Sequence, residues 1–238
     1  MGILTIAFDD AYKATFTNCA AFLAENGIPA TFAVPSSCIG KTLETRPVID
    51  KDDVLFLKDN GHEIASHTSS HKNLLDLFNA EGLEAVKKEM KVSKETIEKE
   101  FGIEVESFVF PFIENNYNQD LCSVASKYYA SSRITTERIF MNWLPLKSPY
   151  TITGMALTDK LTINYCNKLI DLTRNDDNLW LIEVFHLVSD KNTISAHRNE
   201  PYRFFTPIDA FRSHIEYVIS SGIEVLTQKE AVRRFTVK

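Results

Sequence analysis

The chain has 238 residues, of which 44% are hydrophobic and 24% charged, and its formal net charge is −6. This composition is that of an ordinary globular protein with a sizeable core, and it excludes a disordered chain. The acidic balance provides no basic surface for a nucleic-acid backbone, and no apolar run reaches the roughly 18 to 20 residues that span a bilayer. We therefore expect no nucleic-acid partner and no membrane span.

A recurring pattern predicts alternating strands and helices along the chain. Helical segments end at Gly27, Gly61, Gly102 and Gly222, and a short β-rich run follows each glycine within a few residues. Glycine supplies the positive φ that ends a helix. In chain order, the predicted strands are 3–8, 30–34, 62–67, 107–112, 179–185 and 223–226. The predicted helices are 14–25, 50–60, 81–101, 117–129, 207–220 and 228–235.

Two stretches are less regular. Residues 135–178 contain Pro145, Pro149 and Gly154, and we expect a loop-rich excursion there before a short helical run near 161–172. Residues 189–206 are expected to form a long loop. Neither stretch marks a domain boundary, so we expect one domain over residues 1–238. Alternating strands and helices predict βα units around a parallel sheet, either closed as a barrel or open as a doubly wound layer.

The cysteines and the start of the chain bear on its cellular compartment. Cys19, Cys38, Cys122 and Cys166 form no C-x-x-C pair, and we expect them to be reduced thiols. The first apolar stretch is too short for a signal peptide. If Met1 is the native start, this predicts a cytoplasmic protein; otherwise the protein would be exported and its leader removed.

Ionisable side chains follow three of the predicted strands at their carboxyl ends. They are Asp9 and Asp10 after 3–8, His67 and His71 after 63–66, and His186 after 179–185. The carboxyl ends of parallel strands share one face of a barrel or sheet, which is where active sites are built. We therefore expect these two carboxylates and three imidazoles to converge.

The histidine pair and one carboxylate predict a metal site. His67 and His71 are four residues apart, which places them on one side of a helical turn with about 5 to 6 Å between Cβ atoms. Two imidazoles and a carboxylate leave a position for water, as in catalytic zinc sites, and zinc is our first choice. The second carboxylate is then available as a base. Both aspartates face the site only if the strand ends at this point.

Each of these patterns also has a simpler explanation when it is considered alone. An Asp pair before a helix is most often a cap or a solvated turn, two-His spacing is common by accident, and a lone buried His usually belongs to a hydrogen-bonded core. The joint pattern favours the metal site, whereas His62, His197 and His214 have no such support. We find no G-x-S-x-G, G-x-x-x-x-G-K-[ST] or G-x-G-x-x-G motif. Paired glycosidase carboxylates stay open, although Asp9 and Asp10 are close in the chain for that role.

The motifs, taken in order, resemble those of the NodB-like polysaccharide deacetylases. The matching strings are Ile6-Ala7-Phe8-Asp9-Asp10, His67-Thr68-Ser69-Ser70-His71, Phe108-Val109-Phe110-Pro111-Phe112 and Val184-Phe185-His186, and Ile223 to Thr227 with Glu230 fits the closing strand and helix. The resemblance implies a distorted (β/α)₇ barrel and a metal-dependent hydrolase acting on N-acetylated, less often O-acetylated, saccharides. By position it makes Asp9 the general base, His186 the general acid, Asp10, His67 and His71 the metal ligands, and the Phe112 N–H an oxyanion donor.

Three positions depart from the family pattern. Val109 stands where many members carry an arginine, and Ala11 and Ile113 stand where glycine is usual. A base without a guanidinium partner should have a higher pKa, and Arg133 is the candidate substitute. These departures leave open a catalytically impaired sugar-binding module. The resemblance also leaves open a hydrolase of non-sugar C–N bonds, because some members of the superfamily act on such bonds.

Substrate choice is expected to depend on loops 113–120, 135–160 and 189–206. Trp143 and Tyr202, in two of these loops, are candidates to stack on a sugar ring, although an aromatic residue in a loop more often only packs. The sequence does not predict the oligomeric state.

Overall fold

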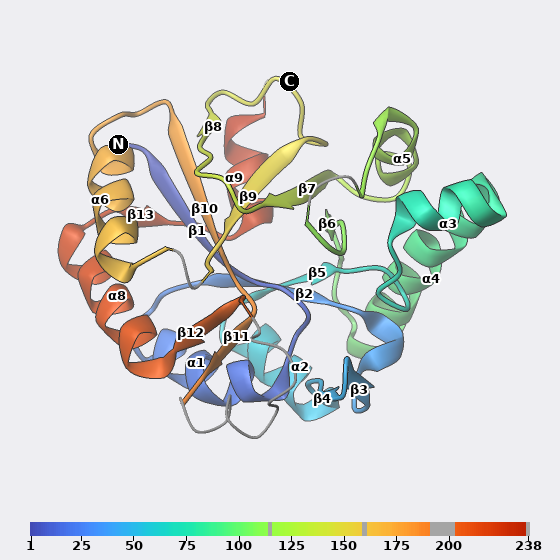
Figure 1. The fold of residues 1–238 in the computed structure, drawn as a ribbon, viewed down its shortest axis with the longest axis horizontal. Helices are drawn as coiled ribbons and strands as arrows, with labels where there is room; N and C mark the ends of the chain where they lie inside the picture. Colours follow the sequence, from blue (N-terminus) through green and yellow to red (C-terminus); the bar gives the residue numbers. More distant parts are fainter. Residues whose placement is uncertain (114–115, 159–160, 191–202, 237–238) are drawn as a thin grey trace.

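Seven parallel strands form a closed barrel in the computed structural model, which describes residues 1–113, 116–158, 161–190 and 203–236 (Figure 1). Around the ring the strands are β1 (Ile3–Phe8), β2 (Ala30–Val34), β5 (Glu63–Ser66), β6 (Ser107–Val109), β7 (Ser131–Thr136), β9 (Ile152–Ala156) and β10 (Leu179–Phe185). The barrel closes where β10 pairs with β1. Outside the ring, β13 (Glu224–Val225) pairs with β1 and β8 (Asn142–Trp143) pairs antiparallel with β10. The predicted (β/α)₇ barrel is confirmed.

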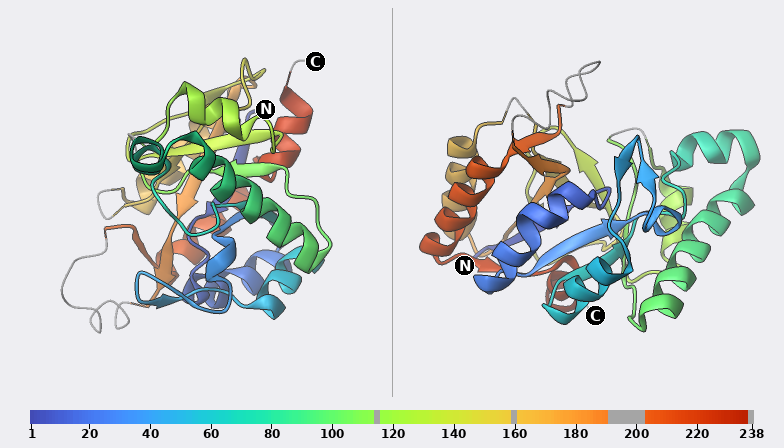
Figure 2. Two further views of the ribbon diagram at one scale, coloured as in Figure 1. Left: turned by 90° about the vertical axis from the view of Figure 1, so that its right-hand side faces the viewer. Right: turned by 90° about the horizontal axis from the view of Figure 1, so that it is seen from below.

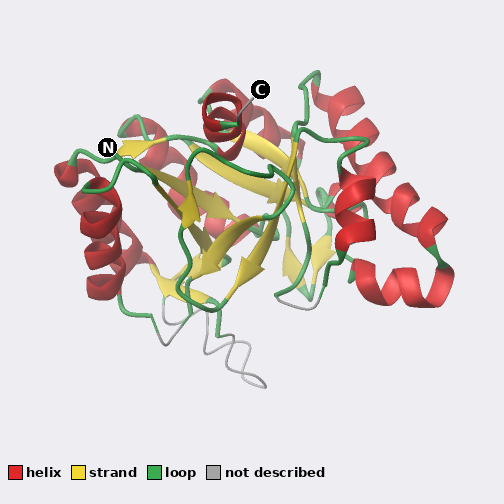
Figure 3. Ribbon diagram, turned by 90° about the horizontal axis from the view of Figure 1, so that it is seen from above, coloured by secondary structure: helices red, strands yellow, loops and turns green. Residues whose placement is uncertain are grey.

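Helices surround the strands on the outside of the barrel (Figures 2 and 3). They are α1 (Lys13–Glu25), α2 (Lys51–Asp59), α3 (Leu74–Glu81), α4 (Leu83–Phe101), α5 (Gln119–Ala125), α6 (Ile163–Arg174), α8 (Ile208–Ser221) and α9 (Gln228–Phe235). Every residue of β1 is buried, as expected for a parallel strand covered on both faces. None of the helices in these ranges combines the length and hydropathy that crossing a membrane requires.

Short elements lie beside the carboxyl ends of the strands. A hairpin of β3 (Thr42–Leu43) and β4 (Arg46–Pro47) follows the 3₁₀ turn Ser36–Cys38, and β11 (Leu187–Ser189) pairs in parallel with β12 (Phe205–Pro207). Of the region 189–206, residues 191–202 lie outside the described residues.

The other end of the barrel is closed by α9. Thr227 and Glu230 form a capping box at its start. The N–H groups of its first turn, which have no acceptor within the helix, donate into the barrel: Gln228 N–H to Thr31 Oγ1 at 2.9 Å, and Lys229 N–H to Glu63 Oε2 at 3.0 Å. The barrel is therefore plugged at this end and open only at the carboxyl ends of its strands.

The strand register brings the carboxyl ends to a common level. Phe8 of β1 lies opposite Phe185 of β10, and the N–H of Asp9 donates to the Phe185 carbonyl at 2.9 Å. The next residue after each strand end, Asp9 and His186, therefore leaves the barrel at the same point. On the other side, Val109 of β6 lies opposite Arg133 of β7.

Two expectations about local structure are wrong in part. Residues 137–151 are mostly loop and the helical run predicted near 161–172 is confirmed as α6, but the stretch 135–178 also contains the end of β7 and all of β9, which complete the barrel. Gly154 suggested a break, but it lies inside β9, where a Cβ would be 2.6 Å from Val184 Cγ2. The predicted helix 81–101 is preceded by a separate helix, α3, and Gly82 with φ +82° divides the two.

Candidate active site

The chain leaves β1 through two left-handed residues. Asp10 has φ +69° and Ala11 has φ +52°, a conformation that costs a residue other than glycine about 1 to 2 kcal/mol. The carbonyl of Ala11 accepts the Ile49 N–H at 3.0 Å, which fixes the turn from outside. Because the strand ends at Phe8, as predicted, both Asp9 and Asp10 line the same pocket.

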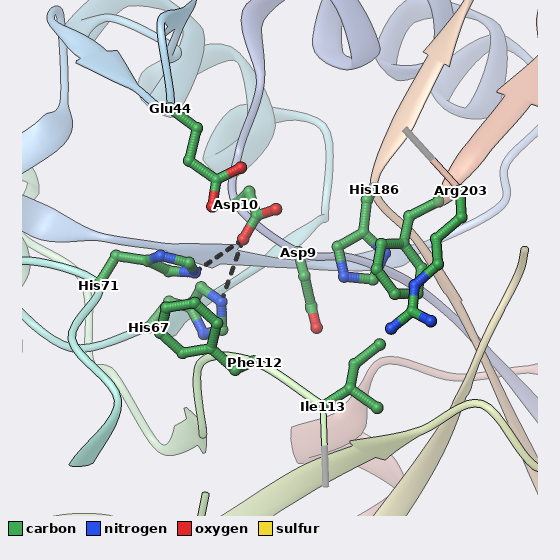
Figure 4. A pocket seen from close by; sticks show the side chains of 10 residues that line it. Asp9, Asp10, Glu44, His67, His71, Phe112, Ile113, His186 and Arg203 are labelled. Atoms are coloured by element: carbon green, nitrogen blue, oxygen red, sulfur yellow. Dashed lines mark ion pairs between the residues drawn. The ribbon is translucent and has the colours of Figure 1, made fainter. Parts of the chain in front are cut away.

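Three of the predicted residues form a compact group of metal-binding atoms. Asp10 Oδ1 lies 3.0 Å from His71 Nε2 and 3.4 Å from His67 Nε2, and one ligand atom from each lies within 4.8 Å of the others (Figure 4). His67 Nδ1 bonds the Val109 carbonyl at 2.9 Å, so this nitrogen carries the proton and Nε2 offers its lone pair to the group. Two imidazole nitrogens and one carboxylate oxygen are a donor set that fits a divalent ion such as zinc.

The backbone between the two histidines is not the helical turn that the spacing predicted. Thr68 and His71 are both left-handed, with φ +65° and +57°, and α3 begins only at Leu74. One local and one tertiary contact determine this loop: the His71 N–H donates to Thr68 Oγ1 at 2.9 Å, and the Ser70 N–H donates to Glu89 Oε2 of α4 at 2.9 Å. These bonds bring the imidazole rings of His67 and His71 to a centroid distance of 5.0 Å.

The pKa shifts in this group reflect charges that stabilise one another. Burial would raise the pKa of Asp10, but the adjacent imidazoles of His67 and His71 hold it well below its usual value. Burial would lower the pKa of His71, but the Asp10 carboxylate raises it. The carboxylate is therefore ionised, the form in which it binds a cation.

Asp9 has a charge partner, and that partner is Arg133. Nη2 of Arg133 lies 2.5 Å from Asp9 Oδ1, its Nη1 donates to Thr135 Oγ1 at 2.7 Å, and the Thr135 hydroxyl lies 3.3 Å from Asp9 Oδ2. Burial alone would raise the pKa of Asp9, but the Arg133 guanidinium, with help from His67 and His186, holds it below its usual value. The expectation that the pKa of Asp9 is raised, because Val109 stands where many family members carry an arginine, is therefore wrong.

Small side chains make room for this arginine. Arg133 is fully buried, and its register partner on β6 is Val109, which packs with Ala33 and Ala65. A Cβ on Gly154 would lie 3.1 Å from Arg133 Nη1. The guanidinium thus comes from the strand next to the expected one, at the same height in the barrel.

His186 lies beside Asp9, across from the metal-binding group (Figure 4). Its carbonyl accepts the Thr15 hydroxyl at 2.7 Å, and its ring lies 4.8 Å from that of Phe204. Among the described residues, none forms a hydrogen bond with its buried Nδ1. Burial lowers the pKa of His186, although the carboxylates of Asp10 and Asp9 oppose the shift.

A pocket of about 240 Å³ brings these groups together with others that the sequence did not indicate. Its lining consists of Asp9, Asp10, Glu44, His67, His71, Phe112, Ile113, His186, Arg203 and Phe204. Glu44 comes from the tip of the β3–β4 hairpin, where it and Thr45 are left-handed without being glycine, so no turn signal predicted it. Arg203 stacks on Phe204 and forms an ion pair with Glu137.

The two other predicted aromatic residues are not in this pocket. Trp143 is 67% exposed and lines a separate hollow with Phe140 and Leu144. It pairs with Leu179 at the start of β10, whereas His186 follows the end of that strand. The structure therefore does not place Trp143 beside the other predicted site residues. Tyr202 lies outside the described residues.

The sequence model of the polysaccharide deacetylase family matches residues 2–130, which include Asp9, Asp10, His67 and His71. The chain belongs to the polysaccharide deacetylase family. No curated protein sequence matches it. The match ends before Arg133 and His186, so the structure is what connects these two residues to the matched motifs.

Solved structures share the fold of this chain. A family 4 acetyl xylan esterase from Clostridium thermocellum, in complex with a cobalt ion, is 16% identical, with a TM-score of 0.59 over 98% of this chain and 91% of that chain. The Xyl-CE4 domain of a xylanase from the hindgut metagenome of Trinervitermes trinervoides is 15% identical, with a TM-score of 0.60 over 98% and 90%. A CE4 family pseudoenzyme from Bacillus anthracis is 11% identical, with a TM-score of 0.57 over 99% and 67%.

Proposed function

We propose that this chain is a metal-dependent hydrolase that removes acetyl groups from an N-acetylated, or O-acetylated, saccharide. The observation that carries the proposal is one pocket in which the Asp10, His67 and His71 group lies beside Asp9 and His186. Membership of the polysaccharide deacetylase family supports the substrate class.

The metal that we propose is zinc, held by Asp10 Oδ1, His67 Nε2 and His71 Nε2. When bound, such an ion polarises the acetyl carbonyl and lowers the pKa of a water toward about 7. The cobalt ion in the acetyl xylan esterase structure supports a divalent ion without choosing between metals.

Two side chains would move the protons. Asp9, whose lowered pKa keeps it ionised at neutral pH, would accept a proton from the attacking water. His186, on the other side of Asp9, would donate a proton to the departing nitrogen or oxygen. The Phe112 N–H would stabilise the negative charge that develops on the acetyl oxygen.

The geometry of the same site also bears on the alternative functions. A catalytically impaired binding module was suggested by Val109 and by the altered turns at Ala11 and Ile113, and the Arg133 guanidinium on Asp9 argues against the first of these two reasons. We also propose that residues 1–238 form one domain, because β1 and β10 close the barrel and α9 plugs it. Stacking of a sugar on Trp143 or Tyr202 stays a prediction.

Acetate release tests the proposal. Chelated protein is given N-acetylated oligosaccharides and O-acetylated sugars with and without zinc, beside an Asp10→Ala control that has lost a ligand. Zinc-dependent release by the wild type alone supports the proposal. If correctly folded protein releases no acetate with any divalent metal, the binding module or a non-sugar substrate is favoured instead.

A substitution at Asp9 separates its role from metal binding. We expect Asp9→Asn to lower kcat about 10³-fold, within the usual contribution of a general base, while bound zinc stays at one per chain. Metal content and kcat are measured on the same preparation. Wild-type kcat in this variant would show that Asp9 is not the base.

A further inference from the structure

The side chain of Asn116 donates hydrogen bonds to two successive backbone carbonyls beside the pocket. Its Nδ2 donates to the Pro111 carbonyl and, at 2.9 Å, to the Phe112 carbonyl. Asn116 is 0% exposed and does not line the pocket, whereas Phe112 and Ile113 both do. The two carbonyls are therefore held toward the protein interior, behind the pocket wall.

The geometry of the peptide bond determines where the matching N–H groups point. In a trans peptide the C=O and the N–H point in opposite directions. The Pro111 carbonyl shares its peptide with the Phe112 N–H, and the Phe112 carbonyl shares its peptide with the Ile113 N–H. Because Asn116 draws both carbonyls to one side, both N–H groups face the other side.

Neither N–H has an acceptor among the described residues. In the part of the chain that the structure describes, the N–H groups of Phe112 and Ile113 donate no hydrogen bond. Phe112 has a left-handed backbone, with φ +66°, which costs a residue other than glycine about 1 to 2 kcal/mol. A left-handed residue of this kind also occurs where successive backbone N–H groups point together and form an anion-binding hollow. Unpaired backbone donors at a pocket are suited to a developing oxyanion.

We propose that Asn116 is a positioning residue that holds the Phe112 and Ile113 N–H groups as a two-donor site for the acyl oxygen. The inference rests on the proposed deacetylation and adds to it a second donor, the Ile113 N–H, and the side chain that orients both. Asn116 contacts neither substrate nor metal and acts only through the 111–113 backbone.

Two variants of Asn116 and one matched control test this role by kinetics. Asn116→Asp has the same shape but offers carboxylate oxygens that cannot donate to carbonyls, and Asn116→Ala removes the donor without adding charge. Asn118→Asp adds the same charge in the same loop. Its side chain only caps α5, accepting the Leu121 N–H at 2.9 Å, and aspartate caps equally well.

We expect both Asn116 variants to lower kcat about 10²-fold, the usual effect of losing an oxyanion donor, with little change in KM. Asn118→Asp should keep wild-type kcat. Melting temperature and zinc content establish that each variant is folded and loaded. Wild-type kcat in both Asn116 variants, or a change confined to KM, would overturn the proposal.

Acetate provides a readout that does not depend on turnover. It is titrated into zinc-loaded protein labelled with ¹⁵N at Phe and Ile, and the amide signals of Phe112 and Ile113 are followed by NMR. Both should shift in the wild type and in Asn118→Asp but not in Asn116→Ala. Wild-type amides that do not respond would overturn the two-donor site. If no saccharide is hydrolysed but these shifts occur, the proposed reaction fails while the donor site stands.

Discussion

The two halves of the barrel contribute to the pocket in different ways. Residues 1–113 supply Asp9, Asp10, His67 and His71 on short motifs that directly follow strands. The second half supplies His186 directly after β10, but it also supplies Arg133 from inside β7, and Arg133 contacts Asp9 across 124 positions of sequence. The sequence therefore predicts site residues that directly follow strands, but it does not predict a side chain that reaches the site from inside a strand on the far side of the barrel.

The largest expected effect comes from removing that crossing side chain. Arg133→Leu leaves the buried Asp9 carboxylate without its guanidinium, which should cost about 3 to 5 kcal/mol of unfolding free energy. Urea unfolding measures the loss, and acetate release should fall with it. Arg133→Lys, which keeps the charge but loses the planar fork, should lose less of both.

Moving the arginine back to the neighbouring strand sharpens the comparison further. Val109 and Arg133 are register partners, so the double variant Val109→Arg with Arg133→Val offers a guanidinium at the same height. It should recover part of the stability and activity that Arg133→Leu loses. If Arg133→Leu equals the wild type in both measurements, Asp9 does not need a charge partner from the second half.

A smaller effect is expected in the first half, from the pH dependence of His62. Burial lowers the pKa of His62 to about 4, and its Nδ1 accepts the Ala30 N–H, which requires the neutral ring. The unfolded value is near 6.5, so between these pH values the unfolded chain binds more protons, and stability falls as pH is lowered from about 6.5 to 4. The expected loss is about 3 kcal/mol.

His62→Asn isolates this contribution, because its amide oxygen accepts the same N–H and does not titrate. Unfolding free energies of the wild type and the variant are compared at pH 7 and pH 4.5. The wild type should lose more stability between these two values than the variant. Parallel pH profiles would assign the acid sensitivity to other groups.

The smallest expected effect is steric. Gly154→Ala puts a Cβ 2.6 Å from Val184 Cγ2 and 3.1 Å from Arg133 Nη1, and such overpacking usually costs about 1 to 3 kcal/mol. Acetate release should fall because Arg133 is displaced. Gly222→Ala is the control: it strains a left-handed helix end with nothing within 4 Å, so it should lower stability and leave acetate release unchanged.

Local patterns predicted most of the fold. β1, β2 and β10 have the predicted bounds because each is a run of apolar or β-branched residues, interrupted only by Glu183 in β10, that ends before a polar residue or proline. β7 and β9 were missed because their polar or glycine residues serve the barrel interior, as Arg133 and Gly154 do. These residues are suited to their contacts inside the barrel, and they do not have the apolar or β-branched character by which a strand is predicted.

The site was predictable where chemistry depends on residue type and hidden where it depends on backbone geometry. Asp9, Asp10, His67, His71 and His186 gather as the strand ends implied. The conformation of the loop between His67 and His71 depends on hydrogen bonds to α4, and the hydrogen bonds from Asn116 to Pro111 and Phe112 depend on the surrounding fold. Glu44 reaches the pocket through a hairpin whose turn residues are unusual.

The register of Val109 and Arg133 has a wider consequence. Neighbouring strands of a closed barrel place one inward side chain each at the same height, so a charge needed at one point of the lumen can be supplied by either strand. A missing motif residue is then no measure of a missing function. What identifies a competent barrel is whether the lumen at that height still contains a guanidinium, from whichever strand it comes.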